Sequence, residues 1–367
     1  MIAARPEAAP AHFSGSYEPQ DVTFLLKPAA LPTVDVATKE RLIQSGARHY
    51  SEMLSPEAPP GPEYLLLYAE ALERNGARLA QDIVSLAAAV AERNEGREVV
   101  IASLARAGTP IGVLLRRALV RLGVAATHYS LSIIRDRGID MEALRYIAAR
   151  HDPRDVVFVD GWTGKGTIAG ELRSSLAGRP LGFVPLLAVV ADPAGCADLA
   201  PSDEDYLIPS GLLNAIVSGL VSRSILNNEL VGPGDFHACV YHAQLAGEDL
   251  SRAFIGQIDA LMSAMRPYPI GADPQLKRTR KAACEAMVRG LMQEFGLKDR
   301  NRIKPGVAEA TRAVLRRVPD RLLIRDRSDP DVAHLIHLAG ERAVTVGQLS
   351  AGNGYRAVAV IRGLGHD

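Results

Sequence analysis

The sequence predicts an α/β protein in which a parallel-sheet domain precedes a smaller α/β domain. Between residues 99 and 190, short apolar runs rich in β-branched residues alternate with single helical patterns. That alternation is typical of a parallel sheet with helices on its faces. The pattern then becomes mostly helical, and a second alternation begins after about residue 300. A chain of 367 residues with 47% hydrophobic residues is long and apolar enough for two or three domains.

The elements of the first part follow from apolar periodicity. A turn and a short strand are expected between Phe13 and Pro28, and helices over 37–54 and 62–94. The alternating region then gives, in order, strand 99–104, helix 110–121, strand 128–134, helix 140–150, strand 155–160, helix 167–176 and strand 183–190. A helix is expected near 211–227, where polar residues recur at near-helical spacing and form one stripe: Asn214, Ser218, Ser222 and Arg223.

The second alternation predicts a small domain with its own sheet. Its elements are helix 305–317, strand 321–325, helix 330–340, strand 343–346 and strand 355–361. The predicted division of the chain is an N-terminal extension over 1–45, an α/β domain over 46–255, a helical connector over 256–299 and the small domain over 300–367.

Composition excludes several classes of protein. The 42 basic and 42 acidic residues cancel, so the chain is no globally basic nucleic-acid binder. The three cysteines have no CxxC spacing, which excludes a disulfide framework and a zinc ribbon. No leader pattern and no apolar run of membrane-spanning length occur, so we expect a cytoplasmic protein without membrane contact. The oligomeric state stays open, a homo-oligomer included.

The most informative segment runs from Val156 to Ile168. Four apolar residues lead into Asp160, and a Gly/Thr-rich loop then opens a helical pattern at Thr167. Such a loop offers free amides and a helix N-terminus to a phosphate. The loop is not a Walker motif, because Gly166 follows Lys165. The expected phosphate-binding residues are Thr163, Gly164, Lys165, Gly166 and Thr167. An ordinary strand-turn-helix unit that binds nothing is the alternative.

Two further loops follow sheet strands and carry arginines. Arg106, with Ala107 and Gly108, stands after strand 99–104, where a guanidinium can bind a pyrophosphate in bidentate fashion. Arg135 and Arg137 lie after strand 128–134 and are placed to close over phosphates. For both loops the alternative is a solvated surface turn.

These motifs carry a resemblance. The acid that ends an apolar strand before a Thr/Gly loop resembles the phosphoribosyl-pyrophosphate motif of type I phosphoribosyltransferases, and Leu104–Gly108 resembles their pyrophosphate loop. Residues 13 to about 255 resemble, more closely, the phosphoribosyltransferase-like family of bacterial tellurite-resistance and stress-response gene clusters. The stretches that carry this are FSGSYEPQDVTFLLKP, GARHYSEMLSPE, SLARAGTPIG, YSLSIIRDRGID, VFVDGWTGKG and DYLIPSGLLNAIVSGLVSRSIL.

The resemblance implies a glycosyltransferase that binds phosphoribosyl pyrophosphate or a related nucleotide. Asp160 and Arg106 would be catalytic, the 163–167 loop would hold the 5-phosphate, and the 106–108 loop would receive the pyrophosphate with Mg²⁺. Gly161 stands where most of these enzymes have a second acid. A different reaction or donor therefore stays open, as does a non-catalytic regulator that senses nucleotides or binds RNA.

The segment Lys304–Arg312 resembles the signature loop and helix of the L7Ae/Pelota RNA-binding fold. The resemblance implies contact with a structured RNA through Lys304, Gly306, Glu309 and Arg312. Eight basic residues face three acids over 301–327, a local excess that attracts phosphates. Ala308 replaces the usual Asn of the signature. A basic accessory domain without RNA is the alternative.

Two remaining features have ordinary explanations. Cys239 lies between His237 and His242, and related sequences carry the label cysteine protease StiP, but a buried structural cysteine is the favoured interpretation. The acids of residues 191–205 are expected to form a solvated loop, except for Asp192, which ends a strand on the expected active edge. The other four are Asp198, Asp203, Glu204 and Asp205.

Overall fold

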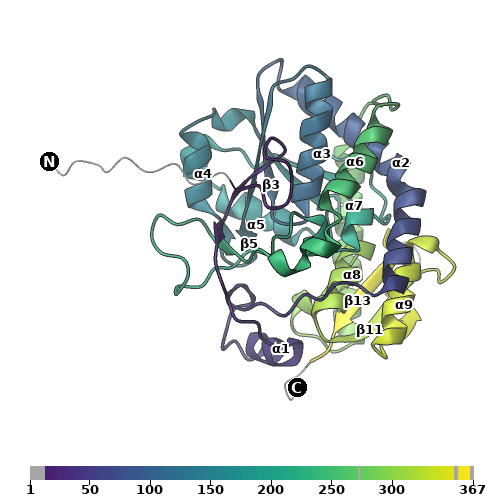
Figure 1. Ribbon diagram of the computed structural model, residues 1–367. Helices are drawn as coiled ribbons and strands as arrows, with labels where there is room; N and C mark the ends of the chain where they lie inside the picture. The colour runs from purple at the N-terminus through teal and green to yellow at the C-terminus, as the bar shows by residue number, and fades with distance from the viewer. Residues whose placement is uncertain (1–12, 272, 351–353, 364–367) are drawn as a thin grey trace.

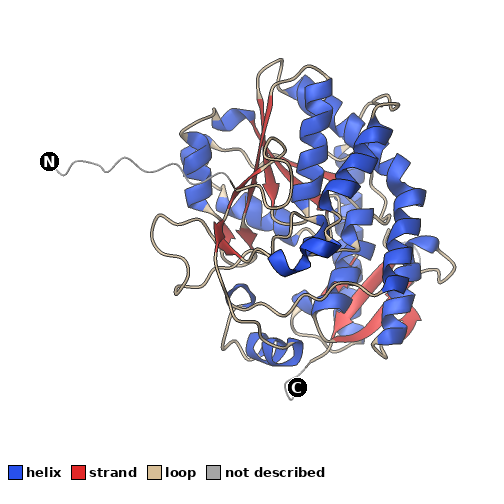
Figure 2. Cartoon of the chain, viewed as in Figure 1, coloured by secondary structure: helices blue, strands red, loops and turns tan. Residues whose placement is uncertain are grey.

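The computed structural model describes residues 13–271, 273–350 and 354–363, and it contains two main sheets (Figures 1 and 2). The larger sheet has five strands in the order β1-β4-β3-β7-β8. Every neighbouring pair in it is parallel. The strands are β1 (Thr23–Leu25), β3 (Val99–Leu104), β4 (Ala126–Leu131), β7 (Val156–Trp162) and β8 (Leu187–Ala191). The predicted α/β fold class with a parallel sheet is confirmed.

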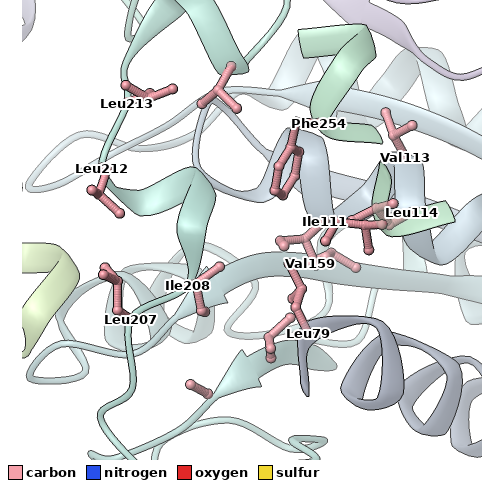
Figure 3. Close-up of a cluster of buried hydrophobic side chains, with 14 of the residues drawn as sticks. Leu79, Ile111, Val113, Leu114, Val159, Leu207, Ile208, Leu212, Leu213 and Phe254 are labelled. Carbon is pink, nitrogen blue, oxygen red and sulfur yellow. The ribbon is translucent and has the colours of Figure 1, made fainter. Parts of the chain in front are cut away.

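Helices cover both faces of this sheet. On one face lie α2 (Pro62–Arg93), α3 (Gly108–Arg121) and α6 (Ser251–Met262), which are in mutual contact. Figure 3 shows the apolar cluster beneath them, where Leu79, Ile111 and Phe254 lie around Val159 of β7. The apolar cluster of the other face contains buried residues of α4 (Met141–Ala148), α5 (Thr167–Ser175) and α7 (Pro274–Glu294). Burial on both faces explains why β3 is entirely apolar or small and fully buried.

Parallel strands bring the loops at their carboxyl ends to one edge of the sheet. The loops after β3, β4 and β7 therefore meet there. They are the three loops that the sequence singled out around Arg106, Arg135 and Asp160.

The C-terminal domain has its own sheet of four strands in the order β10-β13-β11-β12. These strands are β10 (Ile303–Pro305), β11 (Pro319–Ile324), β12 (Thr345–Gln348) and β13 (Ala357–Ile361), with the helices α8 (Val307–Arg316) and α9 (Ala333–Glu341). Strand β10 was not predicted. It is only three residues long, and it includes a proline at the start of the signature segment.

The predicted helix over 211–227 is wrong. The chain forms two short 3₁₀ turns, Pro209–Gly211 and Ala215–Val217. At Gly219 and Leu220 the φ angles are +76° and +58°, which a helix does not tolerate. Beyond them the backbone pairs across to residues 238–241. The polar stripe through Asn214 and Ser222 therefore does not exist.

Other predicted boundaries are also shifted. Helix α1 (Val36–Gln44) ends ten residues before the predicted end at 54, and a 3₁₀ turn (Tyr50–Glu52) follows. The predicted strand 128–134 divides into β4 and β5 (Ile133–Ile134) at Ser132. Strand β8 begins at Leu187, four residues after the predicted start.

Buried carboxylates hold the two domains together. Asp205, 6% exposed, accepts the backbone N–H groups of Val307 (2.9 Å) and Arg356 (2.8 Å). Asp331 of the C-terminal domain, 5% exposed, accepts from the Asn75 amide (2.8 Å) and the Leu207 N–H (3.1 Å). The small domain is thus fixed by buried hydrogen bonds, each of which would leave an unsatisfied group if broken.

In the acidic segment after β8, the expectation of a solvated loop is wrong for Asp205, which is buried, whereas Asp198, Asp203 and Glu204 are partly exposed but paired. Asp198 accepts from the Leu187 N–H (2.8 Å), and Asp203 forms an ion pair with Arg280. Glu204 pairs with Arg78 and Arg356. Together with Asp205, these acids connect the first domain to α7 and to the C-terminal domain. In the described parts of the chain, no helix is long and apolar enough to cross a membrane.

Candidate functional site

A cavity of about 310 Å³ lies where the carboxyl edge of the large sheet meets α8. Its volume is at the lower end of the range for small-molecule sites. The first domain contributes the Asp160 loop and parts of the two arginine loops, and the C-terminal domain contributes residues from Lys304 to Arg317. The two regions that resemble known motifs therefore line one cavity.

The phosphate loop has the shape of an anion cradle. Gly166 caps α5 in the left-handed conformation (φ +75°), and Thr167 begins the helix. The Thr163 hydroxyl donates to Asp192 (2.6 Å), which also accepts the N–H groups of Cys196 (2.8 Å) and Ala197 (3.0 Å). Asp192 therefore orders the loop from behind. All five predicted phosphate-binding residues line the cavity, while their binding role stays a prediction.

The C-terminal domain holds this loop from the other side. The Tyr355 hydroxyl donates to the Gly164 carbonyl (2.6 Å), and the Lys165 ammonium donates to the Ile303 carbonyl (2.7 Å). A Cβ on Gly164 would lie 2.7 Å from Cγ of Glu309, so only glycine allows this approach. Burial, followed by the charge of Lys304, lowers the pKa of Lys165 well below its usual value. The loop and the C-terminal domain thus form one unit.

Asp160 faces the cavity from the end of β7. Its Oδ1 accepts the Gly161 N–H (2.8 Å). Burial raises its pKa to about 7, against the opposing effects of that hydrogen bond and of the Arg312 charge, and Glu309 adds to the rise. A carboxylate with such a pKa changes its charge near neutral pH, as acid–base and charge-stabilising groups of enzymes do.

The Arg106 guanidinium is already paired. Its Nη2 lies 2.6 Å from Oε1 of Glu57, its Nη1 donates to Oε2 of Glu57 (3.1 Å) and to the Val221 carbonyl (3.0 Å), and the side chain is 2% exposed. Burial alone would raise the pKa of Glu57, but the charge and hydrogen bonds of Arg106 outweigh burial and lower it to about 2. The Nε–H of Arg106 has no acceptor in the described parts of the chain. Arg106 thus reaches the cavity with most of its donors in use.

Of the other residues in the two arginine loops, some line the cavity and some do not. Ala107 lines the cavity. Gly108 lies behind it, where a Cβ would be 2.2 Å from the Val159 carbonyl oxygen. Arg135 lines the cavity with its guanidinium 4.9 Å from the centre of the Tyr50 ring. Arg137 forms an ion pair with Glu52 (2.6 Å) and is not among the described residues that line the cavity.

Three of the four predicted RNA-binding residues point into the same cavity. Lys304, Glu309 and Arg312 line it, whereas Gly306, at φ +97°, packs against Asp205. The Arg312 guanidinium lies 4.5 Å from the centre of the Trp162 ring. Burial lowers the pKa of Lys304 to about 8. The signature face of the small domain is therefore directed at the phosphate loop.

Sequence reasoning missed several cations of this site. Nine Lys and Arg residues line the cavity against two acids, Asp160 and Glu309. Of the four that were missed, Arg316 is the one that a pattern could have found, because it follows Arg312 by four residues on one helix face. The others come from distant segments that only the fold brings together. The cations not predicted as site residues are Lys39, Arg223, Arg316 and Arg317.

A second cavity of about 340 Å³ adjoins the first. The two share a wall of four cations, namely Lys39, Arg106, Arg223 and Arg316. Its remaining walls are mainly apolar and include Tyr64, Leu212 and Leu338. The protein thus has two adjacent cavities, one lined by nine Lys and Arg residues and the other by five.

The cysteines are buried and have no histidine partner in the described part of the chain. Burial raises the pKa of Cys239 to about 12 and that of Cys196 to about 11, and it also raises the pKa of Cys284. The polar partners of these sulfur atoms are the Ala194 carbonyl and the Tyr355 hydroxyl. Among the described residues, no group of three or more His, Cys, Asp and Glu is placed to hold a metal ion.

Fold and site together define a class: an α/β protein whose cationic anion site, at the carboxyl edge of a parallel sheet, is completed by a small RNA-binding-type domain. Comparison with known proteins names the family. The chain belongs to the family described as "Tellurite-like stress resistance cysteine protease StiP", whose model matches residues 15–259. Residues 282–363 match the PELOTA RNA binding domain. The resemblances to a tellurite-resistance family and to the Pelota fold are thereby confirmed.

One relative agrees with this placement, and two solved structures are similar over part of the chain. The chain is 43% identical to "Cysteine protease StiP" of Acinetobacter baylyi over 373 residues, which is 96% of this chain and 95% of the relative. A structure of the hypoxanthine phosphoribosyltransferase of Trypanosoma cruzi is similar with a TM-score of 0.29 and 14% identity, over 36% of this chain and 82% of its own. The same enzyme in complex with its product IMP gives a TM-score of 0.28 and 15% identity, over 34% and 75%.

Proposed function

We propose that the protein is an enzyme of the phosphoribosyltransferase-like class, acting in a tellurite or stress response. Its ligand is phosphoribosyl pyrophosphate or a related ribose 5-phosphate nucleotide. One observation carries the proposal: a glycine-capped helix N-terminus, nine cations and Asp160 line one cavity. A ligand with two separated phosphate groups and a sugar between them matches that arrangement.

Each group of the ligand has a counterpart in the site. The amides of residues 163–167 and the N-terminus of α5 suit the 5-phosphate. Asp160 at the end of β7 suits the ribose, where an ionised carboxylate stabilises the positive charge that develops when the glycosidic bond breaks. The cations of the C-terminal half suit the pyrophosphate, which carries the negative charge away as the leaving group.

The neighbouring cavity supports a transfer reaction over simple binding. A transferase needs an acceptor site that opens onto its donor site. The second cavity shares four wall residues with the first, and its lining contains five Lys and Arg residues against nine, which suits an acceptor with less negative charge than the donor.

We propose that RNA contacts the protein only through a nucleotide in the cavity. The matching domain is named for RNA binding, but Lys304, Glu309 and Arg312 face the cavity in this chain. Contact through these residues requires that a nucleotide enter the cavity, so an RNA would act through an unpaired end and not along a duplex. A nucleotide-sensing regulator without catalysis remains the second candidate, because Gly161 leaves Asp160 as the one acid at the end of β7.

A cysteine protease, as the relative is named, is not favoured for this chain. A catalytic cysteine needs a lowered thiol pKa and a histidine within hydrogen-bond distance. Burial has raised the pKa of Cys196, Cys239 and Cys284 instead, and their described polar partners are oxygen atoms.

Calorimetry tests the proposed function. Phosphoribosyl pyrophosphate is titrated into the full chain and into Asp160→Asn, each with and without Mg²⁺. We expect binding to the wild type, and turnover with an acceptor that depends on the Asp160 carboxylate. If millimolar phosphoribosyl pyrophosphate does not bind in either buffer, the proposed donor is wrong.

A further inference from the structure

Two arginines of α8 have N–H donors that no described residue of the chain satisfies. We propose that Arg312 and Arg316 bind the pyrophosphate group of the ligand directly and take the place of a divalent metal ion. This inference rests on the proposed function and assigns the binding of one part of its ligand.

The geometry of the pair fits such a role. The two residues are four apart in one helix, so their side chains leave the same face one turn from each other. Trp162 supports the Arg312 guanidinium from one side, and the Asn214 side chain accepts from Nη2 of Arg316. The Nε atoms of both arginines are buried and have no hydrogen-bond acceptor among the residues that the structure describes. Because an unsatisfied buried donor is costly, these two N–H groups mark the place of a missing acceptor.

The charge of the cavity points to the chemistry of that acceptor. Glu57 neutralises Arg106, and Glu40 neutralises Arg317 (2.5 Å), but neither Arg312 nor Arg316 has an ion-pair partner within 4 Å in the described part of the chain. Burial, followed by the charges of Arg106 and Arg312, lowers the pKa of Arg316 well below its usual value. A pyrophosphate brings several negative oxygens, and a guanidinium can bind them in bidentate fashion.

The donor set does not fit a resident metal ion. Mg²⁺ is held by one or two carboxylates together with substrate phosphates. Here Asp160 has Gly161 where a second acid would stand, and the charges of Lys304, Arg312 and Lys165 already surround Glu309. Any cation that enters also meets the nine Lys and Arg residues of the lining. These residues therefore suit a pyrophosphate without metal better than they suit the magnesium ion that the resemblance implies.

Calorimetry with inorganic pyrophosphate tests the inference. The wild type, Arg312→Gln and Arg316→Gln are titrated in a buffer with EDTA and in one with Mg²⁺. Arg327→Gln is the matched control, because Arg327 lies on the exposed surface of the same domain, where it donates to the Val346 carbonyl. We expect the wild type and the control to bind without metal, and each α8 variant to lose about tenfold to a hundredfold in affinity.

Thermal unfolding of the ligand-free proteins distinguishes a binding role from a structural one. The removal of one of several crowded cations relieves repulsion, so the melting temperature of Arg316→Gln should equal or exceed that of the wild type. A structural role predicts a lower melting temperature. Wild-type affinity in both α8 variants overturns the inference, and so does binding that occurs only with Mg²⁺. In the latter case the proposed function still stands, because it fails only if phosphoribosyl pyrophosphate does not bind under either condition.

Discussion

The two halves of the cavity are built to bind anions by different means. The phosphate-loop half offers backbone amides, whose positions Gly166, Asp192 and the N-terminus of α5 determine. The α8 half offers side-chain charges on a helix whose first N–H group, that of Val307, donates to the buried Asp205 carboxylate. Backbone N–H groups are preorganised and persist in every substitution except one by proline, whereas side-chain charges are removed by a single substitution. Anion binding by the phosphate-loop half should therefore depend on the shape of the backbone. Binding by the α8 half should depend on side-chain charge and on the docking of the C-terminal domain.

The largest expected effect comes from separating the halves. Asp205→Ala leaves the N–H groups of Val307 and Arg356 without their acceptor, and we expect a loss of about 3 kcal/mol in the free energy of unfolding. Affinity for pyrophosphate should fall with it, because α8 loses its anchor. Urea denaturation measures the first effect and calorimetry the second. Glu204→Gln is the control: its side chain is 54% exposed, so we expect less than about 1 kcal/mol. Equal stabilities of the two variants would contradict the docking role of Asp205.

The next effect tests shape in the backbone half. Gly166→Ala places a Cβ 2.6 Å from the Cys196 sulfur at φ +75°, and we expect a cost of about 2 kcal/mol and a loss of phosphate binding. Gly170→Ala, one turn along α5, meets nothing within 4 Å and should stabilise the helix by up to about 1 kcal/mol. Thermal unfolding and phosphate titration measure both variants. An alanine at 166 that binds phosphate like the wild type would show that the loop is not the anion cradle.

A smaller effect concerns Asp160, which lies between the two halves. Its pKa of about 7 lies above the ordinary value of 3.8, so the folded protein resists ionisation of this group. The stability of the free protein should fall as pH rises from about 4 to about 7 and then level off. Asp160→Asn should remove this contribution, so its stability relative to the wild type should be greater at pH 8 than at pH 4. Conversely, kcat/KM of the wild type should rise through pH 7. A flat pH profile of wild-type kcat/KM would argue against an ionised Asp160 in the reaction.

The smallest effect is expected at the cysteines, outside both halves. With a pKa of about 12, Cys239 should not react with a thiol-directed probe at neutral pH, and Cys239→Ala should keep full activity. Labelling of the folded protein followed by mass spectrometry checks this, with the urea-unfolded protein as the positive control. Rapid modification of Cys239 with loss of activity would contradict this prediction and support the cysteine-protease interpretation.

The same difference between the halves explains what the sequence could reveal. The Asp160 loop is a local motif, so its residues and the edge of the sheet to which they belong could be predicted from spacing alone. The partner of Arg106, in contrast, is Glu57, which lies 49 positions away and has no local signal. The inward direction of α8 depends on Asp205 and Asp331, two acids that resemble surface residues in the sequence. The missed turn at Gly219 and Leu220 has a similar origin, because positive φ at a leucine is imposed by the surrounding fold.

The contacts of Tyr355 with Gly164 and of Lys165 with Ile303 have a thermodynamic consequence. A ligand that bridges the cavity binds only the docked arrangement of the two domains, so binding and docking must be coupled. At a concentration a hundred times its Kd, such a ligand adds about 2.7 kcal/mol to the docked state. Amide protons of α8 should then exchange more slowly in the presence of ligand, although this helix belongs to the domain that is named for RNA. Ligand binding should therefore stabilise the docked position of the C-terminal domain over the site.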